Sequence, residues 1–143
     1  ENHHEFGVTV HYMDEGIDTG PIIEVDRFEI DAKSETAQSL ERKSHKRMVE
    51  LFKKTLKRVK KEGILSSEKM SGGRHLSRNE MESLKKIQPG DDIDAKIRAF
   101  WFPPYDGAYV EIEGKNYTLV NRAILEKIDG DAEAIFKHTQ KGS

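Results

Sequence analysis

Three acidic side chains stand close together near the start of the sequence: Asp14, Glu15 and Asp18. A carboxylate held at a reaction centre can accept a proton from an attacking nucleophile, so one of the three could act as a general base. The same residue types are common in solvated turns, and their spacing does not follow the calcium-binding loop of an EF-hand. Spacing alone therefore leaves the catalytic interpretation and the turn interpretation open.

Histidines also gather near this end of the chain. His3 and His4 are adjacent, and His11 follows shortly after them. Neighbouring side chains on an extended segment point to opposite sides, whereas the ligands of a metal ion must converge on one point. We therefore predict surface histidines here and no metal site.

An aromatic cluster at residues 100–109 contains the single tryptophan of the chain. Tyr and Trp are enriched in cores and at interfaces, because they bury a large area while keeping one polar atom. The cluster alone favours a core or a subunit interface over a ligand platform. Its members are Phe100, Trp101, Phe102, Tyr105 and Tyr109.

The composition excludes several classes of protein. The 24 basic and 26 acidic side chains give a net charge of −2, which predicts no general attraction to nucleic acid. The absence of cysteine excludes disulfides, thiolate catalysis and cysteine-ligated zinc. No apolar run approaches the roughly 18 residues of a membrane span, so we expect a cytoplasmic protein without a membrane partner. Hydrophobic residues make up only 35% of the chain, which indicates a core completed against another segment or a long charged helix.

The acidic loop is expected to join two strands. Residues 7–13 alternate between apolar and polar side chains, as a half-buried strand requires. Residues 21–30 form the second predicted strand, in which the apolar phase shifts between Val25 and Phe28. This shift predicts a β-bulge near residues 26–27.

A long helix is predicted after the second strand, with Ser34 as its N-cap and an end near Glu62, just before Gly63. Apolar residues recur along it at helical spacing, which predicts one buried stripe. The stripe consists of Met48, Leu51, Phe52, Leu56 and Val59.

The second half of the chain begins after a Ser- and Gly-rich segment, residues 66–75, which predicts a linker. Ser77 and Glu80 form the pattern of a capping box that opens a short helix. Asp92 is expected to cap another helix over residues 93–100. The segments "YVEI" and "YTLV", on either side of "EGKN", then predict a β-hairpin.

The stretch "GVTVHYMDEGIDTGPII", residues 7–23, closely resembles the signature of the formyltransferases that use 10-formyltetrahydrofolate. That family includes methionyl-tRNA formyltransferase, glycinamide ribonucleotide formyltransferase and the sugar N-formyltransferases. Matched residue by residue, His11 stands where the family has its strand histidine and Asp18 where it has its catalytic aspartate. The resemblance implies that the intervening loop lines the folate pocket. Its implied cofactor-binding residues are Met13, Asp14, Glu15, Gly16 and Ile17.

The chemistry agrees with this assignment. An amine that attacks the formyl group must lose a proton, a task for an aspartate, while hydrogen-bond donors must stabilise the developing oxyanion. The family supplies those donors from an Asn and a His in an N-terminal half whose motifs this sequence does not contain. The resemblance therefore implies a C-terminal portion that is catalytically incomplete by itself.

The predicted fold class is α/β. Residues 1–65 would form the C-terminal part of a mixed-sheet formyltransferase catalytic domain with a long helix. Residues 66–75 would be the linker, and residues 76–143 a small α+β subdomain of helices and a hairpin.

The second half favours one branch of the family. "KIRAFWFPPYDGAYVEIEGKNYTLVN" resembles the segment that follows the catalytic domain in methionyl-tRNA and sugar formyltransferases. The "TYAPKI"-like stretch and full OB-like barrel of the tRNA enzyme are not found, and a tRNA-binding protein is expected to be basic. We therefore predict a nucleotide-linked amino sugar as the amine substrate. Trp101, Tyr105 and Tyr109 are expected at the sugar-nucleotide side of the cleft or at a homodimer interface.

Two alternatives stay open. One is a methionyl-tRNA formyltransferase. The other is a non-catalytic dimerisation or ligand-binding module derived from the family.

Overall fold

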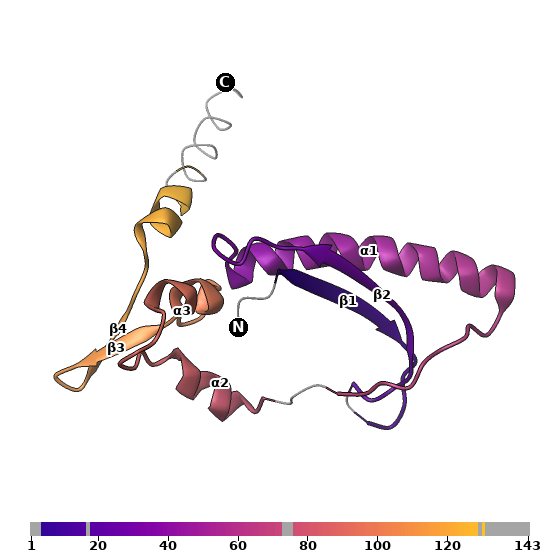
Figure 1. Ribbon diagram of the computed structural model, residues 1–143, viewed down its shortest axis with the longest axis horizontal. Coiled ribbons are helices and arrows are strands. Elements are labelled where there is room, and N and C mark those ends of the chain that lie inside the picture. The colour runs from indigo at the N-terminus through magenta and orange to yellow at the C-terminus, as the bar shows by residue number, and fades with distance from the viewer. Residues whose placement is uncertain (1–3, 17, 73–75, 129, 131–143) are drawn as a thin grey trace, which may run out of the picture. The chain divides into compact units, whose positions relative to one another are not determined.

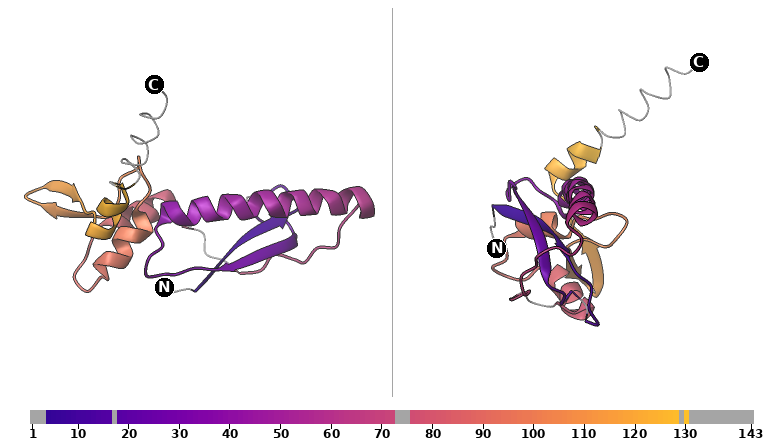
Figure 2. Two further views of the ribbon diagram at one scale, coloured as in Figure 1. Left: turned by 90° about the horizontal axis from the view of Figure 1, so that it is seen from above. Right: turned by 90° about the vertical axis from the view of Figure 1, so that its right-hand side faces the viewer.

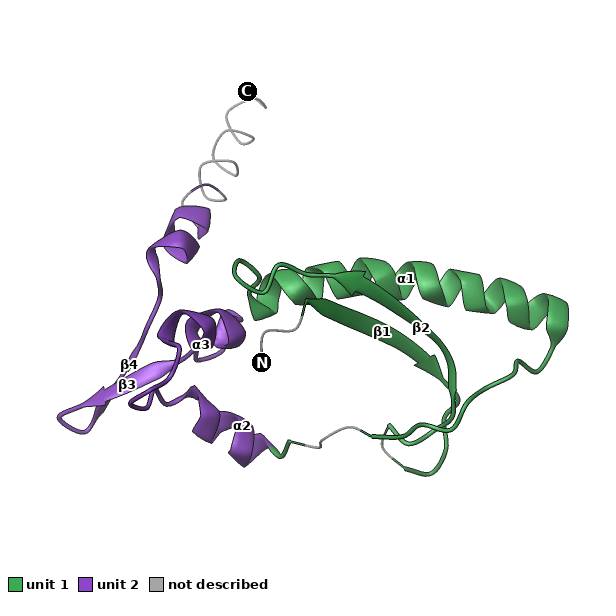
Figure 3. Ribbon diagram, in the orientation of Figure 1, with its two compact units in different colours: residues 1–77 green, residues 78–143 purple. Residues whose placement is uncertain are grey.

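The computed structural model describes residues 4–16, 18–72, 76–128 and 130. The chain divides into two compact units, residues 1–77 and residues 78–143 (Figure 3). In order, the elements are β1 (Glu5–His11), β2 (Ile22–Glu29), α1 (Ala37–Glu62), α2 (Arg78–Lys85), α3 (Ile93–Phe100), β3 (Tyr109–Ile112) and β4 (Lys115–Thr118). Among the described residues, unit 1 holds the strands β1 and β2 and the long helix α1, and unit 2 holds the short helices α2 and α3 and the short strands β3 and β4 (Figure 1). A further helical segment covers residues 122–128.

Unit 1 is an antiparallel hairpin, β1–β2, with α1 lying along it (Figure 2). The core consists of Val8, Phe28 and Leu51, and Val10 and Leu40 are among the half-buried residues around it. Alternate residues of each strand thus face α1, as the period of a strand requires.

The bulge of this hairpin lies elsewhere than the apolar phase predicts. The register shifts between Val10 and His11, which pair with Glu24 and Ile22. The prediction near residues 26–27 is wrong, because Asp26 shares the α1-facing side of β2 with Phe28. Arg47 of α1 pairs with the Asp26 carboxylate at 3.6 Å, so a charged residue can occupy a core-facing position.

Glu24 continues this acidic row towards the start of β2. Its carboxylate accepts hydrogen bonds from Lys54 and, at 3.0 Å, from Arg58. The Lys54 ammonium, supported by Arg58, holds the pKa of Glu24 below its usual value. Lys54 and Arg58, in the C-terminal half of α1, therefore neutralise the Glu24 carboxylate.

The N-cap of α1 is Thr36, and the prediction of Ser34 is wrong. The Thr36 hydroxyl accepts from the Ser39 backbone N–H, and the Ser39 hydroxyl accepts from the Thr36 backbone N–H, which completes a capping box. Ser34 instead donates its hydroxyl to Asp31 at 2.7 Å in the turn before the helix. The helix ends at Gly63, as predicted, where φ is +77°.

The predicted apolar stripe of α1 is not one buried face. Leu51 is buried with Ser44 and Thr55, which face the hairpin. The other four residues are 42–58% exposed: Met48, Phe52, Leu56 and Val59. The helix therefore has a half-polar row that covers the hairpin and, beside it, an apolar row that nothing in the described part of unit 1 covers.

Part of the predicted linker pairs with β2. The Ile22 N–H donates to the Glu68 carbonyl at 2.7 Å, and the Glu68 N–H donates to the Ile22 carbonyl at 2.7 Å. The chain after α1 thus returns to the hairpin end that carries the acidic loop (Figure 1).

Unit 2 has its own small core, made by Ile97, Ala108 and Ile124. Asp92 caps α3 through the Ala95 N–H at 2.9 Å, as predicted. The hairpin turn is shorter than predicted: β4 begins at Lys115, because Glu113 and Gly114 adopt φ values of +51° and +74°. Two successive positive φ values are the signature of a type I′ turn, which joins strands with two residues.

The described residues include no helix that is both long enough and apolar enough to cross a bilayer.

Candidate active site

The candidate site is the loop between β1 and β2. Its base is closed by the Tyr12 N–H, which donates to the Pro21 carbonyl at 3.0 Å. Gly20 lies against the same turn, and a Cβ atom at this position would come within 1.6 Å of the Tyr12 carbonyl oxygen. Only glycine fits there without moving the backbone.

Tyr12 also fixes the loop to the segment that follows α1. Its hydroxyl donates to the Leu65 carbonyl at 3.0 Å and accepts from the Leu65 N–H at 2.8 Å. The alternation of residues 7–13 places Tyr12 on the same side of the strand as Val8 and Val10 but predicts no role for its hydroxyl. The alternation of the strand predicts that the Tyr12 ring is covered. It cannot predict that the hydroxyl binds Leu65, because Leu65 lies 53 residues away along the chain.

Asp14 organises the loop interior. Its Oδ1 accepts from the Gly16 N–H at 3.1 Å and from the Thr19 hydroxyl at 2.6 Å. The Thr19 hydroxyl is the main reason that the pKa of Asp14 is below its usual value. Asp14 is therefore engaged within the loop, and Thr19 is a residue that sequence analysis missed.

Asp18 stands apart from this network. Its φ is +53°, in the left-handed region that few residues other than glycine adopt, and its side chain is 86% exposed. One carboxylate oxygen lies 3.9 Å from Nε2 of His11, the last residue of β1. The structure thus brings together the two residues that the sequence assigns to catalysis.

The tautomer of His11 follows from its other nitrogen. Nδ1 lies 2.9 Å from the Tyr12 carbonyl oxygen, which can only accept a hydrogen bond. With the ring hydrogen on Nδ1, the lone pair of Nε2 faces Asp18. A protonated ring would instead present Nε2–H to the Asp18 carboxylate as an ion pair.

The other expected folate-binding residues line the same loop. Met13 is 93% exposed, and Glu15 and Gly16 are exposed beside it. A Cβ atom on Gly16 would come within 2.1 Å of the Thr19 hydroxyl oxygen, so the loop is tight at this point. Ile17 lies outside the described residues.

The three expected aromatic residues lie in unit 2 and form no part of the loop. Trp101 is half-buried against the unit 2 core, and Tyr109 opens β3. Tyr105 is 69% exposed and its ring stacks on Phe102 with centroids 5.8 Å apart.

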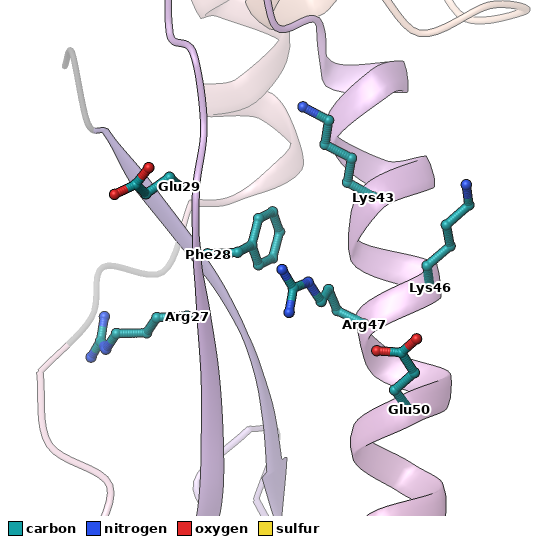
Figure 4. Close-up of a pocket in the computed structure, with 7 residues that line it drawn as sticks. All are labelled: Arg27, Phe28, Glu29, Lys43, Lys46, Arg47 and Glu50. Atoms are coloured by element: carbon teal, nitrogen blue, oxygen red, sulfur yellow. The ribbon is translucent and has the colours of Figure 1, made fainter.

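A hollow lies between β2 and α1 (Figure 4). Phe28 and Arg47 point towards each other within it, with the guanidinium carbon 5.4 Å from the ring centroid. Arg27 and Glu29 point to the other side of β2 and Lys46 points away from the hairpin, so the charged groups do not converge (Figure 4). We assign this hollow to packing between strand and helix.

Among the described residues no three His, Asp or Glu side chains are grouped as a metal site would require. Of the two adjacent histidines, His3 lies outside the described residues.

The hairpin and the helix that covers it resemble part of the α/β domain of solved formyltransferases. Solved formyltransferase structures resemble about four-fifths of the chain. A 4-N formyltransferase from Francisella tularensis covers 79% of it, with a TM-score of 0.68 and 26% identity. An N-formyltransferase from Helicobacter canadensis covers 80% of it, with a TM-score of 0.67 and 31% identity.

Sequence comparisons agree. Residues 1–56 match the family described as formyl transferase. Methionyl-tRNA formyltransferase of Janthinobacterium sp. (strain Marseille) is 32% identical over 112 residues, which are 77% of this chain. Residues 1–56 of the chain therefore belong to the formyltransferase family. The chain spans 34% of the length of that relative, and 49% and 43% of the two solved chains.

Proposed function

We propose that the protein transfers a formyl group from 10-formyltetrahydrofolate to a primary amine, and that Asp18 accepts the proton which the amine loses. The observation that carries the proposal is the placement of Asp18. Its exposed carboxylate lies 3.9 Å from Nε2 of His11, in a loop whose base is closed by backbone hydrogen bonding. A general base must reach the solvent-facing side where its substrate binds, and Asp18 meets this requirement.

The proton balance of the reaction needs one such carboxylate. As the amine nitrogen forms its bond to the formyl carbon it becomes positively charged, and Asp18 takes its proton. The bond between the formyl carbon and the donor nitrogen then breaks, and the proton passes to that nitrogen or to water. His11 has the role of holding the Asp18 carboxylate from the end of β1, as the protonated ring that presents Nε2–H to it.

Loop residues 13–17 are proposed to hold the folate. Met13, a residue that is 93% exposed, offers the apolar surface of its thioether side chain. Covering such a side chain with a flat ring removes apolar area from water, which favours binding. Asp14 contributes by shaping the loop through Gly16 and Thr19.

We propose that the groups that stabilise the oxyanion come from the remainder of a formyltransferase catalytic domain, which packs on the exposed row of α1. Met48, Phe52, Leu56 and Val59 supply an apolar surface of the kind that interfaces bury. The shares of the solved relatives that this chain spans, 49% and 43%, leave a comparable length of chain to cover it. In this proposal residues 1–65 complete the catalytic domain, and residues 76–143 are the small C-terminal subdomain.

The amine is proposed to belong to a nucleotide-linked amino sugar. The Helicobacter canadensis relative is described in complex with folinic acid and dTDP-3-aminofucose. The net charge of −2 also favours a small substrate over tRNA. Trp101, Tyr105 and Tyr109 are proposed to form the sugar-nucleotide side of the cleft or a homodimer interface.

A methionyl-tRNA formyltransferase is the second candidate, favoured by the 32% identity to that enzyme. The third, a non-catalytic module that binds a ligand or a second subunit, predicts no turnover at all.

The test is formyl transfer by the full-length protein, with Asp18→Asn as the variant. We offer 10-formyltetrahydrofolate with dTDP- and UDP-linked amino sugars and, separately, with charged initiator tRNA. The proposal expects turnover of a sugar nucleotide and its loss in Asp18→Asn. Turnover of tRNA alone supports the second candidate, and unchanged turnover in Asp18→Asn refutes the role of this residue.

A further inference from the structure

We propose that Thr19 is a positioning residue for Asp18 and that it acts through Asp14. The inference rests on the proposed function, because it gives a reason for the geometry of the proposed base. It concerns the conformation of the loop and requires no contact between Thr19 and substrate.

Asp14 accepts hydrogen bonds from one residue before Asp18 in the sequence and from one residue after it. A single oxygen, Oδ1, accepts from the N–H of Gly16 and from the hydroxyl of Thr19, at 3.1 and 2.6 Å. These donors precede and follow Asp18. The Asp14 carboxylate thus fixes the distance between Gly16 and Thr19, and Asp18 lies between these two residues in the sequence.

Asp18 needs such a restraint. Its φ of +53° is a conformation that a side-chain-bearing residue keeps only when the surrounding structure enforces it. Its own side chain is 86% exposed, so burial does not provide the restraint. The Thr19 hydroxyl lies so close to Gly16 that a Cβ there would approach it to 2.1 Å. The backbone of the turn at Gly16 therefore packs directly against the Thr19 hydroxyl.

The far end of the loop is fixed independently. Gly20 lies against the Tyr12 carbonyl, and Tyr12 is bonded to Pro21 and Leu65. Removing the Thr19 hydroxyl should therefore free the loop crest while its base stays closed. The expected consequence is an Asp18 carboxylate that samples positions away from Nε2 of His11.

The first experiment compares Thr19→Val, which keeps the shape and removes the hydroxyl, with Thr19→Ser, which keeps the hydroxyl. In the full-length protein we expect Thr19→Val to lower kcat for formyl transfer by about 10- to 100-fold, the range that misplacement of a catalytic group produces. The KM for 10-formyltetrahydrofolate should rise by a smaller factor than kcat falls, because Asp14 also shapes the folate-holding loop. Thr19→Ser should recover most of kcat. Thr118→Val, an exposed threonine of β4, is the matched control. A rise in KM with unchanged kcat would instead make Thr19 a folate-binding residue and overturn the inference.

The second experiment separates positioning from any other effect. In an Asp18→Asn background, Thr19→Val should cause no further loss of kcat, because there is no base left to position. Asp14→Ala should reproduce the loss of Thr19→Val, and the double variant should be no worse than either. A loss from Thr19→Val that is undiminished in the Asp18→Asn background overturns the inference while leaving the proposed function standing. Unchanged activity in Asp18→Asn itself refutes the proposed function first, so the two failures are distinguishable.

Discussion

Nε2 of His11 and a carboxylate oxygen of Asp18 lie 3.9 Å apart, although the loop that joins the two residues is largely exposed. Nδ1 of the same ring is held by the Tyr12 carbonyl. The imidazole is thereby oriented from the strand side, and Asp18 approaches it from the loop side. Both members of this pair, His11 and Asp18, are supplied by this chain.

Replacing His11 tests whether this orientation matters. His11→Gln in the full-length protein is expected to lower kcat/KM for formyl transfer by about 10- to 100-fold, because Asp18 loses its partner. His45→Gln, at an exposed position of α1, is the control and should be silent. Equal activity of the two variants would show that His11 plays no part in catalysis.

Tyr12 is predicted to stabilise unit 1 as well as the loop. In Tyr12→Phe the buried backbone N–H and carbonyl of Leu65 lose the hydroxyl that they share. A buried group left without its partner costs about 1–3 kcal/mol in free energy of unfolding, which urea titration measures. Tyr105→Phe removes an exposed hydroxyl and should change the same quantity by less than about 0.5 kcal/mol. A Tyr12→Phe variant as stable as the control would contradict this account.

The exposed row of α1 makes a prediction about the full-length protein. If the remainder of a catalytic domain covers it, Phe52→Ser should reduce the free energy of unfolding by roughly 2 kcal/mol or more, because a buried ring loses its apolar contacts. Lys53→Ser, the adjacent residue on α1, is the control. A change below about 0.5 kcal/mol for Phe52→Ser would mean that the row stays open to water.

Glu24 should make stability depend on pH. Because Lys54 and Arg58 lower its pKa in the folded state, the charged carboxylate stabilises the fold at pH values above its unfolded pKa. This contribution is lost as the pH falls through the lowered folded pKa. Urea titrations at neutral and strongly acidic pH should therefore differ less for Glu24→Gln than for the unsubstituted protein. Glu41→Gln, exposed on α1, is the control. If the stability of Glu24→Gln falls between neutral and acidic pH as much as that of the unsubstituted protein, the ion pair of Glu24 does not cause the pH dependence.

Local patterns predicted most of the elements. The alternation of residues 7–13, the capping residue Asp92 and the terminating Gly63 each depend on neighbours within a turn or a strand. Elements with such signals lie close to where they were expected. The prediction of Ser34 as N-cap was wrong for a related reason: Ser34 and Thr36 are both suitable cap residues, and Ser39 completes a box with only one of them.

The faces of the elements were less predictable. The acidic residues of β2 looked like a break in the apolar phase, because the sequence does not show that Arg47, Lys54 and Arg58 lie opposite them. For the same reason the apolar residues of α1 appeared to form one buried stripe. Which row of a helix is covered depends on the element that packs on it, and that element is distant along the chain.

The sequence by itself determined that a histidine lies near the end of one strand and that an aspartate stands in the short loop after it, and it placed that loop between two strands. The resemblance to a known family singled out Asp18 among the acids of the loop, and the tertiary structure showed how the surroundings of Asp14 and Asp18 differ. Asp14 is committed to Gly16 and Thr19, whereas Asp18 is exposed at a positive φ beside His11. The physical reason is that residue type and spacing limit which hydrogen bonds are possible. Closure of the loop against Tyr12 and Leu65 decides which of them form.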